Sequence, residues 1–271
     1  MKKLVYHLYV SNDFDTNPFT FCNKFCLQKY INVFDEATFF IAVDDIHDKT
    51  RIDKGMSFIK DVCGDLLNPT VFVIKNDKEI REVVTFEMYI LPMIEYGSDD
   101  YVLFGHNKGT SMYKYWDLKS LLTWVIILYY YNFEFMDDVF KNFEEGKPLY
   151  GSNLSDMSYR TEFNGYESKS FYAGTFYWLN MKEVRKTIES LNIDLFGNEK
   201  FKYYAEVFPI LFSDSQKGSY KNSIVLKPET YNTYRMDDKS WNSYLLQLDD
   251  ELQCVPFVNE IIEKVVNIKK N

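Results

Sequence analysis

The chain has 271 residues, of which 46% are hydrophobic and 26% are charged, and this is the composition of a globular protein and not of a disordered one. A chain of this length can bury a full core without disulfides or structural metals. Its formal net charge of −9 argues against a general nucleic-acid surface, because no excess of basic residues would neutralise a phosphate backbone.

Cysteine spacing and the most apolar segments indicate the compartment. The four cysteines form neither a C-x-x-C pair nor the spacing of a zinc site, so they predict reduced thiols in a cytoplasmic protein. They are Cys22, Cys26, Cys63 and Cys254. The N-terminal apolar run is too short for a signal peptide. Residues 121–133 (LLTWVIILYYYNF) are too few to span a bilayer and predict a buried helix, with peripheral membrane contact as the alternative.

The first hundred residues alternate predicted strands and helices. Strands are expected at residues 3–10, 37–43, 70–75 and 101–105. Helices are expected at residues 17–34, 54–67 and 79–97, with Pro92 bending the last of them. Strands that are nearly continuous in apolar residues and separated by helices indicate an α/β fold, with a mostly parallel, Rossmann-like sheet covered by helices on both faces. Such folds bind ligands at the carboxyl ends of their strands.

The second half of the chain has a different residue pattern. Two strand-like segments, residues 148–154 and 170–180, are separated by a polar segment from Ser152 to Ser170 that we expect to be a loop. Helices are predicted at residues 181–191, 200–212 and 257–270, the last after a turn-rich tail. The chain has no internal repeat and no Pro/Ser-rich linker, so a single domain over residues 1–271 is the simplest organisation.

The fourth predicted strand ends in the motif YVLFGHNKG, which sets a histidine and a lysine between two glycines. Alternate residues of an extended segment point the same way, so His106 and Lys108 should face one spot. Gly105 and Gly109 allow close backbone approach and leave N–H groups for an anion, so a phosphate or diphosphate is the natural ligand. An ordinary strand end with a solvated lysine explains the same pattern equally well.

An acidic loop, VDDIHDK, follows the second predicted strand. Asp44 and Asp45 could bind a divalent cation through their oxygens. They could also accept hydrogen bonds from ribose hydroxyls, as acidic residues do after the strands of nucleotide-binding sheets. A solvated acidic turn is the more frequent meaning of such a run.

The segment FYAGTFYWLN combines a small-residue kink with an aromatic strand. Exposed backbone at Gly174 and Thr175, followed by the rings of Tyr177 and Trp178, would give a flat wall on which a sugar ring can stack. Alternatively, the segment is an internal strand with one glycine where a neighbour comes close.

A lone acid, Glu206, lies in the strongly apolar segment YYAEVFPILF. Burial would raise the pKa of its carboxyl group towards the range in which it can act as a general base or acid. It could equally lie on the solvent face of a helix, or pair with Arg185.

Taken in order, these motifs resemble a group of bacterial and viral sugar-transfer proteins that includes the rhamnan-synthesis F-type proteins. The resemblance rests on KLVYHLYV, YVLFGHNKGTS, Trp116, PLYGSNL, FYAGTFYWLN and YYAEVFPILF, and it covers about residues 1 to 213. In that group the strand-end motif is similar to H-T-K-G, and a later motif is similar to A-G-(T/S)-M-F-W. Here Asn107 stands where threonine is usual, and residues 176–178 replace the Met-Phe-Trp run.

The resemblance implies a GT-A-like glycosyltransferase that holds a nucleotide-diphosphate sugar at the carboxyl edge of the sheet. Residues 1–110 would form the nucleotide-binding half, residues 111–213 the acceptor and catalytic half, and residues 214–271 a C-terminal extension. Most such enzymes end the fourth strand in a D-x-D that holds a metal, whereas this chain has H-N-K. Lys108 would then neutralise the diphosphate directly, leaving the need for manganese or magnesium open.

Under the same resemblance the remaining candidate residues acquire roles. Gly174 and Thr175 would lie under the donor sugar and the acceptor, and Glu206 would be the general base that deprotonates the acceptor hydroxyl. His106 would be a hydrogen-bond donor, a metal ligand or an acid. The acceptor would be a glycan or a lipid-linked saccharide. Two other functions stay open: a non-catalytic carbohydrate- or nucleotide-binding module, and a nucleotidyltransferase that needs a metal at Asp44 and Asp45.

Overall fold

The computed structural model describes residues 1–108, 118–151, 154–163, 166–172, 175–195, 204–212, 220–222 and 255–268. Its main feature is a mixed sheet with the strand order β3-β2-β1-β4-β8-β5-β9. In this sheet β8 runs antiparallel to both of its neighbours, and every other pair is parallel. The strands are β1 (Lys2–Tyr9), β2 (Glu36–Val43), β3 (Thr70–Lys75), β4 (Tyr101–His106), β5 (Leu149–Gly151), β8 (Tyr177–Asn180) and β9 (Tyr220–Asn222).

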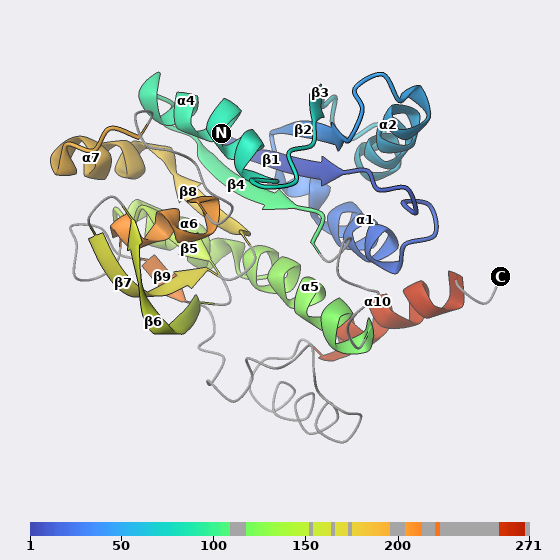
Figure 1. Ribbon diagram of the computed structural model, residues 1–271. Helices are drawn as coiled ribbons and strands as arrows, with labels where there is room; N and C mark the ends of the chain where they lie inside the picture. Colours follow the sequence, from blue (N-terminus) through green and yellow to red (C-terminus); the bar gives the residue numbers. More distant parts are fainter. Residues whose placement is uncertain are drawn as a thin grey trace.

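Helices cover both faces of this sheet, which makes a three-layer α/β fold (Figure 1). One face packs against α1 (Pro18–Tyr30), α2 (Lys49–Cys63), α5 (Leu118–Phe133), α6 (Met136–Glu144) and α10 (Val255–Ile268). The other packs against α3 (Val83–Thr85), η2 (Phe86–Ile90), α4 (Leu91–Glu95), α7 (Met181–Leu191), α8 (Tyr204–Val207) and η3 (Phe208–Phe212). The predicted mostly parallel sheet with helices on both faces is therefore confirmed.

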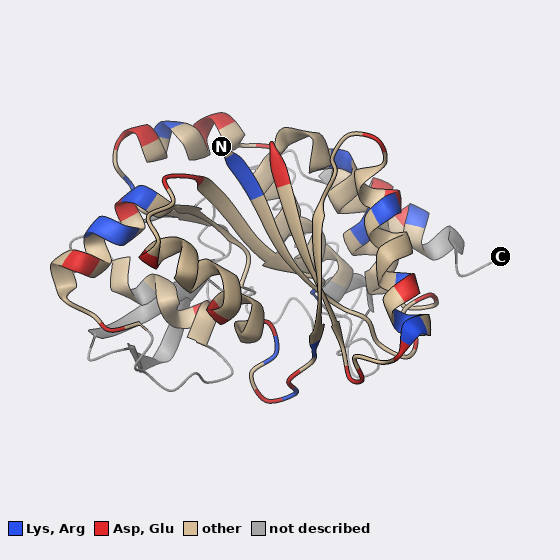
Figure 2. Ribbon diagram, turned by 90° about the horizontal axis from the view of Figure 1, so that it is seen from above, with Lys and Arg blue, Asp and Glu red and all other residues tan. Residues whose placement is uncertain are grey.

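Alternation along the strands divides the core into two layers. In β1, Leu4, Tyr6 and Leu8 face the α1 side, whereas Val5 faces the α4 side. Because both faces are covered, β1 and β2 read as continuous apolar runs, as expected of parallel strands. Strands β1 to β4 have Lys, Arg, Asp or Glu only at their ends, and most of the other charges lie on helices and loops (Figure 2).

Local capping explains where the helices begin. Asn17 accepts a hydrogen bond from the backbone N–H of Phe19 at 3.0 Å, and Pro18 occupies the first turn of α1. Asp48 accepts from the N–H of Arg51 at 3.1 Å, so α2 begins at Lys49, five residues before the predicted start. The single turn η1 (Ile31–Val33) completes the helical segment after α1.

The helix expected at residues 79–97 begins later, at Val83, because Asp77 binds the backbone N–H groups of Glu79 and Ile80 in a separate turn. Its middle section, η2, is a π-helical turn in which the N–H of Leu91 reaches the carbonyl of Phe86. Pro92 follows immediately and has no N–H to continue the ladder. The bend expected at Pro92 therefore takes the form of a widened turn just before it.

One sequence expectation is wrong. The polar segment from Ser152 to Ser170 is not a loop, because β6 (Leu154–Phe163) pairs antiparallel with β7 (Tyr166–Tyr172) in a separate two-stranded sheet. Its polar composition hid the strands. In the described part of the chain, no helix is both long and apolar enough to cross a membrane.

Candidate functional site

The candidate site lies at the carboxyl ends of β1 and β4. From β1 the chain adds β2 and β3 on one side, then returns to place β4 on the other side of β1. In open α/β sheets a ligand crevice forms outside the carboxyl ends of the strands, where the strand order reverses in this way. His7 and His106 are register partners at this place.

Asn107 ties the two strand ends together. Its backbone N–H donates to the carbonyl of His7 at 3.2 Å. Its side chain both accepts from the N–H of Tyr9 and donates to the carbonyl of Tyr9, each at 2.8 Å. The buried Asn107 amide thus imitates one more residue of β-pairing after β4 has ended. This contact gives a structural reason for asparagine at position 107.

His106 faces a carboxylate that the sequence did not single out. Nε2 of His106 lies 3.8 Å from Oε1 of Glu82, and the side chains are only 12% and 13% exposed. Burial alone would raise the pKa of Glu82, but its electrostatic interactions with His106 and Lys108, together with the residue's own backbone N–H, lower it to about 2. Glu82 is therefore ionised at neutral pH and provides a fixed negative charge behind His106.

A second histidine lies on the neighbouring strand, as the register partner of His106. His7 is buried in β1, and its Nδ1 lies 2.8 Å from Oγ1 of Thr85. Burial lowers its pKa to about 4, although the charge of Glu82 acts in the opposite direction. At neutral pH His7 is therefore an uncharged hydrogen-bonding group. Its contact with Thr85 ties the end of β1 to α3.

Lys108 lies just beyond Asn107 and is partly buried. Its backbone carbonyl accepts a hydrogen bond of 3.0 Å from the side chain of Asn23 on α1. Its Nζ lies 4.9 Å from the ring centroid of Trp124 on α5, a cation–π distance. Both contacts fix the strand-end loop against the helices. Gly109, expected to approach an anion with its backbone, lies outside the described residues.

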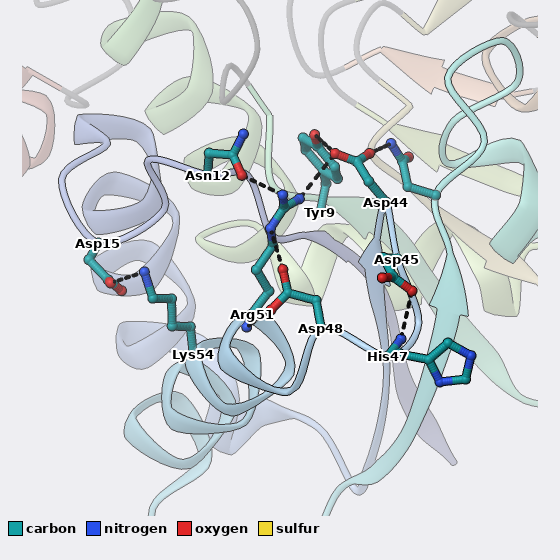
Figure 3. Close-up of polar contacts among 10 residues, drawn as sticks. Tyr9, Asn12, Asp15, Asp44, Asp45, His47, Asp48, Arg51 and Lys54 are labelled. Carbon is teal, nitrogen blue, oxygen red and sulfur yellow. Dashed lines mark hydrogen bonds and ion pairs between the residues drawn. The ribbon is translucent and has the colours of Figure 1, made fainter.

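A second polar group forms at the ends of β1 and β2 (Figure 3). Asp44 accepts hydrogen bonds of 3.0 Å from Arg51 and from Asn76, and the hydroxyl of Tyr9 lies 3.5 Å away. Burial alone would raise the pKa of Asp44, but the hydrogen bonds from Asn76 and Arg51 outweigh it and hold that pKa below its usual value. Tyr9 links this group to the β4 end, because its backbone is bound by Asn107.

Arg51 is held from several sides. Its Nε lies 3.0 Å from Asp48, its Nη1 binds Asp44, and its Nη2 donates to Asn12 (Figure 3). Asp45 plays a different part, because it is exposed and accepts from the N–H of His47 at 2.9 Å within its own turn. The structure therefore separates the two acids that the sequence presented as a pair. Within the described residues, no three His, Cys, Asp or Glu side chains gather as metal ligands would.

The segment that precedes β8 reaches the same edge. Gly174 lies outside the described residues, but Thr175 is buried and donates from its hydroxyl to Oε1 of Glu82 at 3.3 Å. Its φ is +50°, a left-handed conformation that costs a β-branched residue free energy. Strain of this kind persists only where the surroundings hold the residue, and it is concentrated at functional sites.

Tyr177 and Trp178 are fully buried, so their rings do not form an open wall in this structure. The hydroxyl of Tyr177 donates to the carbonyl of Ala205 at 2.6 Å. The indole Nε1 of Trp178 donates to the carbonyl of Asn132 at 2.8 Å, and its ring stacks on Phe34. The side chains therefore fit the alternative interpretation of an internal strand, because each ring packs in one of the two core layers.

Glu206 belongs to α8 and is partly buried. Its charge and that of Glu82 both contribute to raising the pKa of Tyr177, although burial is the largest cause. Ala205, the residue before Glu206, binds the Tyr177 hydroxyl through its carbonyl, and this contact brings α8 to the start of β8. Because β8 runs antiparallel to β4, its start is at the carboxyl edge that holds His106.

Three residues of the site were missed from the sequence: Glu82, Arg51 and His7. A usable signal existed for His7, a lone histidine inside an apolar strand. Glu82 and Arg51 looked like ordinary charges near helix starts. They reach this edge only because the connections between the parallel strands place those helix starts beside the strand ends.

Comparison with known proteins adds no family assignment. A scan against protein-family models finds no match, and neither does a search of curated protein sequences. Function must therefore be argued from the site.

Proposed function

We propose that the protein is a glycosyltransferase that uses a nucleotide-diphosphate sugar and transfers the sugar to a hydroxyl acceptor. The observation that carries the proposal is the arrangement of Glu82, His106 and Lys108 at the topological switch point of a mostly parallel sheet. The resemblance of the ordered motifs to GT-A-like sugar-transfer proteins supports the same conclusion.

Donor cleavage needs positive charge where the leaving diphosphate forms. In this proposal Lys108 supplies positive charge to the diphosphate and His106 donates a hydrogen bond to it, because preorganised donors stabilise developing negative charge most effectively in a partly buried site. Glu82 acts through His106 as a positioning residue, since its carboxylate lies 3.8 Å from Nε2. Arg51, which is paired with Asp44 and Asp48, lies at the same edge of the sheet.

The two nearby acids suit different roles. A general base is most effective when its pKa lies near the working pH. Glu82, with a pKa of about 2, is too weak a base for this role. Glu206 is partly buried and follows Ala205, whose carbonyl binds Tyr177, and it carries the proposed role of deprotonating the acceptor hydroxyl.

The metal-dependent alternative receives less support from Asp44. Both of its carboxylate oxygens already accept hydrogen bonds from Arg51 or Asn76. Asp45 is exposed and turned into its own loop. A nucleotidyltransferase using these acids would have to break the Asp44–Arg51 pair before a cation could bind there.

Thermal-shift screening against UDP, GDP, dTDP and CMP, with manganese or with EDTA, tests donor binding first. A ligand at a hundred times its dissociation constant stabilises the folded state by about 2.7 kcal/mol, which is a visible shift. We expect one nucleotide to stabilise the protein in EDTA as well as in manganese. No shift with any of the four nucleotides would contradict the proposal.

Two variants then separate binding from transfer. Lys108→Ala should weaken nucleotide binding roughly ten-fold or more, the usual cost of a lost charge-assisted contact. Glu206→Gln should leave binding intact and lower transfer about 10²- to 10⁴-fold. Lys60→Ala, which removes an exposed charge from α2, is the matched control and should change neither.

Donor binding without transfer or donor hydrolysis would favour the non-catalytic module. Activity that is lost in EDTA and in Asp44→Asn, but kept in Glu206→Gln, would favour the nucleotidyltransferase.

A further inference from the structure

Strand β3 forms one edge of the main sheet. It pairs with β2 on one side, and no strand of the described chain pairs with its other side. Native edge strands are usually protected by central charges, prolines or bulges. The sequence of β3, TVFVIK, has only the terminal Lys75 for this purpose, and Phe72 and Val73 are 43% and 41% exposed.

Hydrogen bonding to β2 shows which backbone groups of β3 point outwards. The N–H of Asn76 binds the carbonyl of Val43 at 2.7 Å, so Asn76 is directed towards β2. Residues of one strand point their N–H and C=O alternately to its two sides. Phe72 and Ile74 therefore also bond towards β2, whereas Val71, Val73 and Lys75 present their N–H and C=O groups at the outer edge.

These outward groups are self-complementary about a two-fold axis through Val73. An antiparallel second copy of β3 would set Val73 opposite Val73 and Val71 opposite Lys75. Each such pair exchanges two hydrogen bonds in an antiparallel ladder. On the other face, Phe72 would lie opposite Ile74 of the second copy; Ile74 is buried in its own core layer, so the exposed ring of Phe72 supplies most of the apolar surface there.

We propose that the β3 edge is the interface of a symmetric homodimer, in which two β3 strands pair antiparallel and join two sheets into one. An isologous two-fold contact requires a surface that complements itself, and the outward backbone groups of β3 meet this requirement in hydrogen bonding, with Val73 facing Val73 on the axis. The ring of Phe72 is held in place by stacking on Phe40, with a centroid distance of 5.1 Å, and it is still 43% exposed. Exposed Met88, on the helix after β3, adds further apolar surface near Tyr89, which also contacts Phe72.

The dimer is tested by measuring mass in solution at increasing protein concentration, by light scattering or sedimentation. The chain has a mass of 32.3 kDa, so a dimer should weigh 2 × 32.3 = 64.6 kDa. Val73→Lys places two like charges opposite each other on the axis and should give a folded monomer. Tyr96→Lys, which replaces a residue 82% exposed at the end of α4, is the matched control and should remain dimeric.

Cysteine cross-linking with oxidised glutathione tests the register. Hydrogen-bonded antiparallel partners have Cα atoms about 5.5 Å apart, within reach of a disulfide, so Val73→Cys should cross-link to a dimer. Lys75→Cys should not, because the two copies of residue 75 would lie four residues apart along the strand, about 14 Å. A wild-type monomer at every concentration, a dimeric Val73→Lys variant, or equal cross-linking of both cysteine variants would overturn the proposal.

Discussion

At the scale of single residues, His7 shows how burial decides protonation. The imidazole is held in β1 against Thr85, and burial lowers its pKa to about 4 from the ordinary value of 6.5. Between these two values the unfolded chain binds a proton that the folded chain does not. The free energy of unfolding therefore falls as the pH falls from about 6.5 to about 4. Glu82 extends this loss of stability to lower pH. Its stabilising contribution is present above its ordinary pKa of 4.5 and is lost as the pH falls towards 2.

We expect His7→Asn, which can keep a hydrogen bond to Thr85, to flatten the pH dependence of stability between about pH 6.5 and 4. The loss of unfolding free energy that His7 causes across this interval, and that the variant should lack, amounts to roughly 2–3 kcal/mol. Urea unfolding at a series of pH values measures it. His47→Asn, which changes an exposed histidine, should keep the wild-type slope. An unchanged slope in His7→Asn would show that another group titrates there.

At the scale of elements, Gly105 is explained by the packing of β4 against the residue that precedes β8. A Cβ added to Gly105 would lie 2.5 Å from Cε2 of Phe176 and 2.7 Å from its Cδ2. The ring of Phe176 is itself fixed in the core, with its centroid 4.7 Å from that of Tyr129. The glycine before His106 thus allows close approach, as the sequence suggested, but the neighbour is a phenylalanine ring of the same chain.

Gly105→Ala should destabilise the protein by roughly 1–3 kcal/mol, the usual cost of overpacking a core. Adding Phe176→Leu should recover part of this loss, because the smaller side chain makes room for the new methyl group. Chemical denaturation of both single variants and the double variant gives the coupling free energy. If the two effects simply add, the ring contact is not what requires glycine here.

At the scale of the whole molecule, the last helix packs against both halves of the chain. Phe257 of α10 contacts Tyr30 of α1 and Tyr130 of α5, with ring centroids 6.0 Å and 5.7 Å away. Nζ of Lys29 lies 4.0 Å from the same ring. The C-terminal segment, expected as an extension, thus supplies part of the core on the α1 side of the sheet.

Phe257→Ala should therefore cost about 3–5 kcal/mol, the range for removing a buried aromatic ring. Hydrogen exchange should show faster opening in α1 and α5 than in α4 and α7, which lie on the other face of the sheet. Val265→Ala, a smaller truncation on the same helix, should have a weaker effect of the same kind. Unchanged exchange in α1 and α5 would mean that α10 does not support them.

The amino-acid sequence by itself determined the order of strands and helices in the first half, because continuous apolar runs and helix caps are local signals. It also placed His106 and Lys108 at a strand end and predicted the layered fold. Tertiary structure alone decided that Glu82 meets His106, since the two residues come from different elements joined by a crossover. It also decided that Tyr177 and Trp178 face the core. An aromatic strand has the same pattern whether its rings meet solvent or other side chains, so only the packing of neighbouring elements can distinguish the two.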